Sequence, residues 1–170
     1  MLDLTDYLPY LLNRAGARIA TAFTKEARQH GISLQMWRVL AALNQRNGQM
    51  VGELADTTSI EISTLSRVLD QMQKKRLVLR RRDGADQRSV TIHRTTAGEA
   101  ITAKLIPVAR AYETKALGGL DARQAKLLKT MLRQVYANLD TLPGAAKEKS
   151  RTTEAARLSS RTKNQFVAKQ

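Results

Sequence analysis

The chain of 170 residues contains no cysteine, and aromatic residues make up only 4% of it. The lack of cysteine excludes disulfides, thiolate metal sites and thiol-based redox sensing. No apolar run approaches the roughly 18 residues of a membrane-spanning helix, and the N-terminus has no signal-peptide pattern, so we expect a cytoplasmic protein. Acidic residues are also few, 15 against 29 Lys and Arg, which gives a net charge of +14. This balance predicts a polyanionic partner.

Nucleic acid and an anionic membrane surface are both polyanions. Membrane binding would need a basic amphipathic helix with exposed aromatic or leucine anchors. The strongest basic cluster lies instead on a predicted helix and hairpin, between residues 61 and 94, where nine Lys or Arg stand against four Asp or Glu. We therefore expect a nucleic-acid partner and no membrane partner.

Residues typical of an enzyme site are missing. His30 and His93 are far apart in sequence and neither has a metal-ligand spacing. The chain has no phosphate-binding glycine loop and no G-x-S-x-G nucleophile motif. Carboxylates are sparse and typical of helix caps or salt-bridge partners. The sequence predicts no enzyme, no metal and no cofactor.

The segment from Glu61 to about Lys75 predicts a helix with two different faces. Leu65, Leu69 and Met72 recur at helical spacing and can face a core. The opposite face begins with short hydroxyl residues, which let the helix backbone approach a duplex. This face comprises Ser63, Thr64, Ser66, Arg67, Asp70 and Lys74. The alternative is a solvated helix whose hydroxyl residues only bound a turn.

A hairpin rich in arginine follows this helix. Residues 77–80 and 89–93 are β-prone, and the Asp83-Gly84 pair between them is a hairpin turn signal. The arginines of this ribbon are Arg80, Arg81, Arg82 and Arg88. Arginines at this density repel one another unless an anion lies nearby, and a phosphate backbone is the simplest such anion. A helix of 50–58 before the hydroxyl-bearing helix completes a winged helix-turn-helix pattern.

The flanking segments predict long helices. We expect a helix at 7–29, capped by Asp6 with Pro9 in its first turn and stopped by Gly31. A second helix begins after Ser33 and ends at residues 47–48. Beyond the hairpin, Thr95 can cap a helix that reaches the glycines at 118–119 and kinks at Pro107.

The last predicted helix begins with a capping box formed by Asp121 and Gln124. Apolar residues then alternate at steps of three and four, a seam typical of helix pairing. The seam comprises Ala125, Leu128, Leu132, Val135 and Leu139. Residues 144–170 are basic and poor in large apolar side chains, which predicts a mostly disordered tail. Such a tail is either a solvated extension or a source of salt-sensitive DNA affinity.

Several short motifs together resemble the MarR family of bacterial transcriptional regulators. They are the wing element Asp86-Gln87-Arg88, the helix start Thr95-Thr96-Ala97-Gly98, the pairs Leu54-Ala55 and Leu77-Val78, and the run Ser63 to Arg67. The similarity covers roughly residues 4–139. The chain departs from the family at Ser59 and Arg76, where glycine is frequent, and at Arg94, where an apolar residue is usual. At Ser59 and Arg76, a non-glycine residue either adopts a left-handed conformation at a cost of about 1 kcal/mol or ends the helix differently.

The resemblance implies a mainly α fold, a winged helix-turn-helix with a small β-hairpin wing and long N- and C-terminal dimerisation helices. Residues 1–143 would form this domain, with a DNA-binding lobe at 33–94 and dimerisation helices at 4–30 and 95–141. The protein would be a homodimeric repressor that binds a pseudo-palindromic, double-stranded DNA operator. Ser63, Thr64, Ser66 and Arg67 would contact groove and phosphate.

In the wing, Arg88 would probe the minor groove and Asp86 would brace the hairpin. Arg80, Arg81 and Arg82 would contact the DNA backbone or support the wing.

By the same resemblance, a small aromatic acid or phenolic anion would bind between the dimerisation helices and the DNA-binding lobe and release the protein from DNA. Candidate pocket residues are Arg14, Arg18, His30, Trp37 and Arg38. Each of them could equally be a surface or core residue, and Trp37 in particular could be a core anchor.

Two other functions stay open. An architectural protein would bind DNA without sequence preference and without a ligand, and an enzyme acting on a small aromatic compound is the weaker alternative.

Overall fold

The structure, a computed structural model, describes residues 1–83 and 86–139, and only the backbone of 83 and 86–89. The predicted basic tail at 144–170 lies outside these residues. The helices are α1 (Leu8–Gln29), α2 (Leu34–Gln45), α3 (Val51–Thr58), α4 (Ile62–Lys74), α5 (Thr96–Ala116) and α6 (Ala122–Leu139). The strands are β1 (Gln49–Met50), β2 (Val78–Asp83) and β3 (Asp86–Arg94). The mainly helical fold with a small β wing, predicted from sequence, is confirmed.

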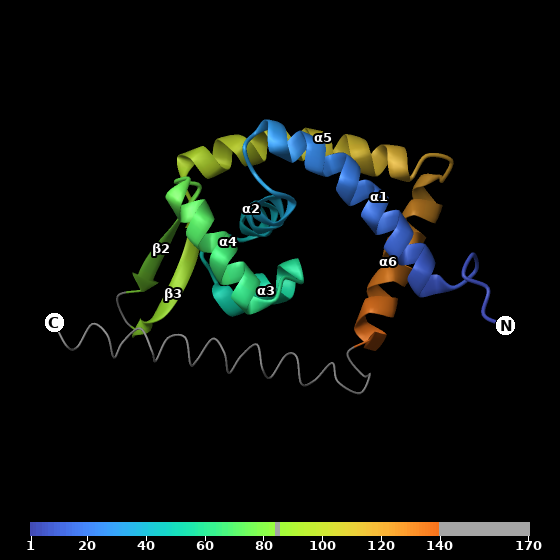
Figure 1. The fold of residues 1–170 in the computed structure, drawn as a ribbon, viewed down its shortest axis with the longest axis horizontal. Helices are drawn as coiled ribbons and strands as arrows, with labels where there is room; N and C mark the ends of the chain where they lie inside the picture. Colours follow the sequence, from blue (N-terminus) through green and yellow to red (C-terminus); the bar gives the residue numbers. More distant parts are fainter. Residues whose placement is uncertain (84–85, 140–170) are drawn as a thin grey trace.

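One hydrophobic core holds α2, α3, α4 and the sheet together. Its fully buried side chains include Leu40, Leu43, Leu54, Leu65 and Leu69. Ile92 from β3 and Leu105 from α5 complete it, so the wing and the long helix α5 share the core of the lobe. Figure 1 shows α2, α3 and α4 gathered on one side of α5, with the β2–β3 ribbon extending beside α4. Helix α4 and the wing therefore rest on the same buried core.

The sheet has three antiparallel strands in the order β1-β3-β2. The hairpin pairs Val78 with Arg94 and Arg82 with Val90. The short strand β1 pairs Gln49 with Ile92 and was not expected from the sequence. The Gln49 side chain is buried and donates to the carbonyl oxygens of Ala42 (2.9 Å) and Arg46 (2.7 Å). These bonds tie β1 to the end of α2, where the Ala42 carbonyl also accepts the Arg46 N–H at 3.2 Å.

Most of the predicted helix caps are present. The Ser33 hydroxyl accepts from the Met36 N–H at 3.2 Å, and Asp121 and Gln124 bond reciprocally at 2.8 and 2.9 Å. The predicted cap by Asp6 is wrong, because α1 begins after Tyr7 and no side chain caps it. Pro9 in the first turn leaves fewer N–H groups to satisfy there. The kink at Pro107, which lies inside α5, stays a prediction.

The remaining helices extend away from the lobe. In Figure 1, α1 runs along α5 and then continues towards the side where α6 descends. Helix α6 buries no residue, and one ion pair, Lys129 to Glu113 at 2.7 Å, joins it to α5. Large apolar side chains on α1 and α6 are exposed, namely Leu8, Leu11, Leu12, Ile19, Leu127, Leu128, Met131, Leu132, Tyr136 and Leu139. No helix in the described part of the chain is long and apolar enough to cross a membrane.

Candidate nucleic-acid interface

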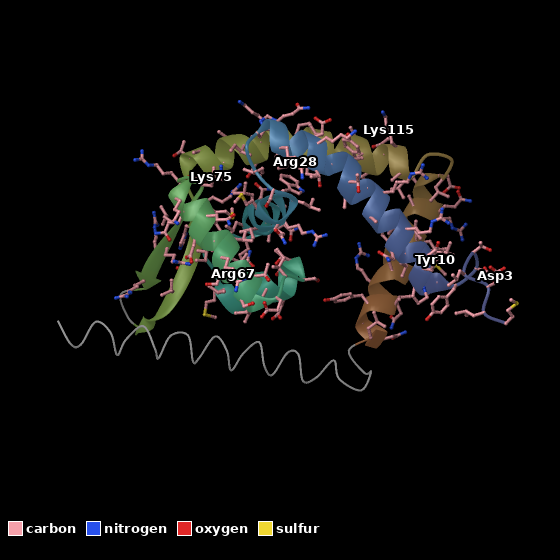
Figure 2. The ribbon with its side chains drawn as sticks, in the orientation of Figure 1. Asp3, Tyr10, Arg28, Arg67, Lys75 and Lys115 are labelled. Atoms are coloured by element: carbon pink, nitrogen blue, oxygen red, sulfur yellow. The ribbon has the colours of Figure 1, made fainter. Side chains whose placement is uncertain are left out.

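Helix α4 separates into a buried face and a polar face, as the sequence predicts. Its buried residues are Ile62, Leu65, Val68, Leu69 and Met72. Ser63, Arg67, Asp70 and Lys74 are exposed, and Thr64 and Ser66 are half-buried. Figure 2 shows Arg67 at the exposed surface of α4. A face with short hydroxyls at its start and cations further along can lie close to a phosphate backbone.

Glu61, which sequence reasoning did not select, organises the start of this face. Its carboxylate accepts from the Thr64 N–H at 3.0 Å and from the Ser63 hydroxyl. The Ser63 hydroxyl, followed by the backbone N–H groups of Ser63 and Thr64, holds the pKa of Glu61 below its ordinary value. One cap thus holds the hydroxyl of Ser63 and the backbone N–H of Thr64. The signal in the sequence is an acidic residue at the predicted start of the helix, where the helix dipole favours negative charge.

The turns before and after α4 use left-handed residues that are not glycine. Ser59, between α3 and α4, has φ 51° and ψ 40°, and Arg76, after α4, has φ 57°. These are the two positions where the family often has glycine. Of the two outcomes foreseen, the chain adopts the left-handed one. The backbone path into and out of α4 is therefore kept despite a Cβ that disfavours it.

A tight junction joins the end of α4 to the start of α5. The Thr95 hydroxyl donates to the Arg76 carbonyl at 2.6 Å and accepts from the Gly98 N–H at 3.1 Å. The Thr95 N–H donates to the Leu77 carbonyl at 3.1 Å. A Cβ on Gly98 would lie 2.2 Å from that same oxygen. The Thr-x-x-Gly motif thus has a local cause, since threonine makes the bonds and glycine allows the approach.

The wing arginines fall into different environments. Arg80 forms an ion pair with Asp70 of α4 at 2.6 Å and is 27% exposed. Arg81 and Arg82 are exposed, and within the described part of the chain neither forms an ion pair. Arg88 and Asp86 lie on β3, in the part of the hairpin whose side chains are outside the described residues. The sequence treated Arg80, Arg81 and Arg82 alike, whereas the structure separates Arg80 from the other two.

Two polar links fix the base of the wing to the end of α2. Arg94 donates from its backbone N–H to Asn47 (3.0 Å) and from its guanidinium to Asn44 (2.8 Å). Its buried Nε has no hydrogen-bond partner among the residues that the structure describes. Glu53 pairs with Arg46 at 2.6 Å and accepts from the Met50 N–H at 2.8 Å, and the bond to Arg46 is the main reason why its pKa is lowered.

Within the described ranges, no hydrogen bond or ion pair joins any two of the predicted effector residues. Arg14 and Arg18 are exposed on α1, and the Arg14 guanidinium lies 5.5 Å from the centre of the Tyr10 ring. His30 follows the last turn of α1, and Arg38 is exposed on α2.

Trp37 is half-buried against the core, with its ring 5.2 Å from that of Phe23. Phe23 in turn meets Tyr112 edge-on at 6.1 Å. Trp37 therefore packs where α1, α2 and α5 meet, as a core anchor would.

A helix, a turn, a polar-faced second helix and a β-hairpin on one core define a winged helix-turn-helix protein. Residues 32–90 match the MarR family. A MarR family transcriptional regulator from Silicibacter pomeroyi is 34% identical, over 82% of this chain and 94% of that chain, with a TM-score of 0.75. The chain belongs to the MarR family of transcriptional regulators and is not an enzyme.

Two further relatives are more distant. The transcriptional repressor NicR of Pseudomonas putida is 25% identical over 133 residues, which are 78% of this chain and 84% of NicR. BpsR of Bordetella bronchiseptica is 23% identical over 76% of this chain and 98% of its own, with a TM-score of 0.68. The DNA binding of BpsR is regulated by 6-hydroxynicotinic acid. At this identity, the likeness to BpsR is one of fold.

Proposed function

We propose that the protein is a ligand-responsive repressor that binds a pseudo-palindromic operator as a homodimer. The observation that carries the proposal is the exposed face of α4, with its hydroxyls and cations, beside an arginine-rich wing on the same core. Two recognition helices about one helical turn apart, roughly 34–36 Å, would enter successive major grooves. Repression agrees with the repressor NicR among the relatives.

The polar residues of the interface fall into groups with different roles in this proposal. Ser63, Thr64, Ser66 and Arg67 contact base edges and phosphates from α4, whereas Arg88 enters the minor groove from the wing. Asp86, two residues earlier, braces the hairpin. Arg81 and Arg82 contact the DNA backbone, and Arg80 either does the same or supports the wing.

The dimer is supported by the apolar surface that the single chain leaves exposed on α1 and α6. Leu132, 38% exposed, lies in the predicted seam of α6, which buries nothing within the chain. Leu132→Glu should place a charge in the interface and yield a monomer in sedimentation. The matched control is Leu120→Glu, at a leucine that is 43% exposed in the turn before α6 and outside the seam. A Leu132→Glu protein that stays dimeric would remove the seam from the proposal.

The effector is an aromatic acid or a phenolic anion. Arg14, Arg18, His30 and Arg38 offer cationic or hydrogen-bonding groups, and Trp37 offers an aromatic wall. A ligand could bind more tightly to a dimer conformation whose recognition helices do not match the half-site spacing of the operator. This difference in affinity alone would shift the dimer off DNA. The fold is shared with BpsR, whose DNA binding responds to 6-hydroxynicotinic acid.

The test is binding of the purified protein to the intergenic DNA upstream of its own gene, against scrambled DNA, by fluorescence anisotropy at about 150 mM salt. A panel of aromatic carboxylic acids is then added. Preference for the native sequence and release by a panel compound would support the proposal. Equal binding to both DNAs, with no release, would replace it with the architectural function, which the basic surface alone could serve.

A further inference from the structure

The ion pair between Asp70 and Arg80 joins the recognition helix to the wing. Asp70 is the only acidic residue in α4, and it lies on the exposed face between Arg67 and Lys74. Those two cations stand three and four residues away, the spacings at which helical charges pair. Asp70 instead bonds the Arg80 guanidinium of β2 at 2.6 Å. A carboxylate in the middle of a DNA-facing surface is therefore committed to a wing arginine.

This pairing changes which cations are available to DNA. Within the described part of the chain, Arg67 and Lys74 form no ion pair, although the charge of Arg67 contributes to the lowered pKa of Glu61. Arg80 has its charge matched by Asp70 and is only 27% exposed. A phosphate contact by Arg80 would have to use its remaining N–H groups, beside a carboxylate that repels the phosphate, or break the charge-assisted bond from Nη2 to Asp70.

We propose that Asp70 is a specificity-determining residue, which holds Arg80 off the phosphate backbone and uses it to fix the wing against the recognition helix. The inference rests on the proposed DNA binding and assigns Arg80 to wing support. Because phosphate contacts carry no sequence information, withholding one lowers affinity for all DNA alike. Because a fixed wing can reach the minor groove only when α4 is in register, the brace favours the operator. The first effect lowers specific and non-specific affinity equally, and the second raises the ratio of specific to non-specific binding.

The experiment measures the salt dependence of binding to scrambled DNA for four proteins: wild type, Asp70→Asn, Arg80→Gln and the double variant. Each neutralised phosphate contributes about −0.9 to the slope of log K against log salt. Asp70→Asn should free Arg80 and steepen the slope by about 0.9, an extra factor of about 3.5 in the affinity lost between 50 and 200 mM salt. Arg80→Gln should leave the slope unchanged, because Arg80 makes no phosphate contact in the wild type.

The double variant separates the brace from a simple charge effect. If Asp70 acts through Arg80, the steeper slope disappears when Arg80 is also replaced. If Asp70 only repels DNA, Asp70→Asn has the same effect in both backgrounds and the proposal fails. An Arg80→Gln slope shallower by about 0.9 would also overturn it.

Three further measurements complete the design. Asp70→Glu keeps a carboxylate and should keep the wild-type slope. Asp56→Asn is the matched control for the loss of one acid, because Asp56 is exposed on α3 and forms no ion pair among the described residues. Wild-type protein that shows no preference for its own upstream DNA would overturn the repressor function together with this inference. A wild-type preference that Asp70→Asn does not reduce would overturn only the inference.

Discussion

Replacing Gly98 with alanine should disrupt the junction between α4, the wing and α5. The added Cβ would lie 2.2 Å from the Leu77 carbonyl oxygen, where real Cβ contacts essentially never come below 3.0 Å. That oxygen belongs to the backbone and accepts the Thr95 N–H, so it cannot rotate away. The nearest atom from another residue, a Leu40 methyl at 3.3 Å, belongs to a fully buried side chain. The chain must therefore separate by about 1 Å at a packed site.

Three contributions set the change that Gly98→Ala makes to the free energy of unfolding. Overpacking of this kind costs about 1–3 kcal/mol, and loss of the bond from Thr95 to Leu77 adds about 1 kcal/mol. Alanine in place of glycine within a helix returns about 1 kcal/mol. The net loss is about 1–3 kcal/mol, which corresponds to a fall in Tm of roughly 2–12 °C for a chain of this size.

Thermal and urea unfolding monitored by circular dichroism measure this loss. The matched control is Gly52→Ala in α3, where the new Cβ meets nothing within 4 Å and stability should stay level or rise. If Gly98→Ala is as stable as that control, the close approach to Leu77 does not constrain the protein, and the explanation of the Thr-x-x-Gly motif is refuted.

Three other predictions concern the turns, the acid range and the wing. Ser59→Gly and Arg76→Gly should each stabilise the protein by about 0.5–1 kcal/mol in urea unfolding, because relief of a left-handed conformation exceeds the added chain entropy of glycine; destabilisation would contradict the strain. The pKa of Glu53 is lowered from its ordinary value of 4.5 by Arg46, so its contribution to stability is present above that pH and is lost as the pH falls. The stability difference between wild type and Glu53→Gln should therefore shrink in unfolding series from pH 7 towards pH 3, and a constant difference would count against the pair. Arg88→Ala should weaken operator binding by about 1–3 kcal/mol and leave the dimer intact, and unchanged affinity in anisotropy would remove the wing from the interface.

The elements that periodicity and capping residues define were predictable from sequence. The buried stripe of α4 follows from apolar residues at helical spacing, and the cap by Ser33 follows from its position before such a stripe. The left-handed residues Ser59 and Arg76 were identified by resemblance, because they stand where the family has glycine.

Other features depend on contacts between segments distant in the chain. Strand β1 is only two residues long and exists because Gln49 and Met50 pair with β3. The ion pair of Arg80 with Asp70 spans ten residues, so a run of similar arginines could not reveal which one is neutralised. Asp6 is a residue type that often caps helices, but Tyr7 occupies the N-cap position of α1.

The bonds from Thr95 to the carbonyls of Arg76 and Leu77 join the end of α4 to the start of α5, so a tilt of α5 would carry α4 with it. Helix α5 has 21 residues and is therefore about 31 Å long. If the end of α5 near α6 is the pivot, a tilt of only 5° displaces the junction by almost 3 Å, close to the 3.4 Å rise of one base pair. For the proposed repressor, a ligand that acted where α1, α2 and α5 meet would therefore need no large motion to put the two α4 helices of a dimer out of step with their half-sites.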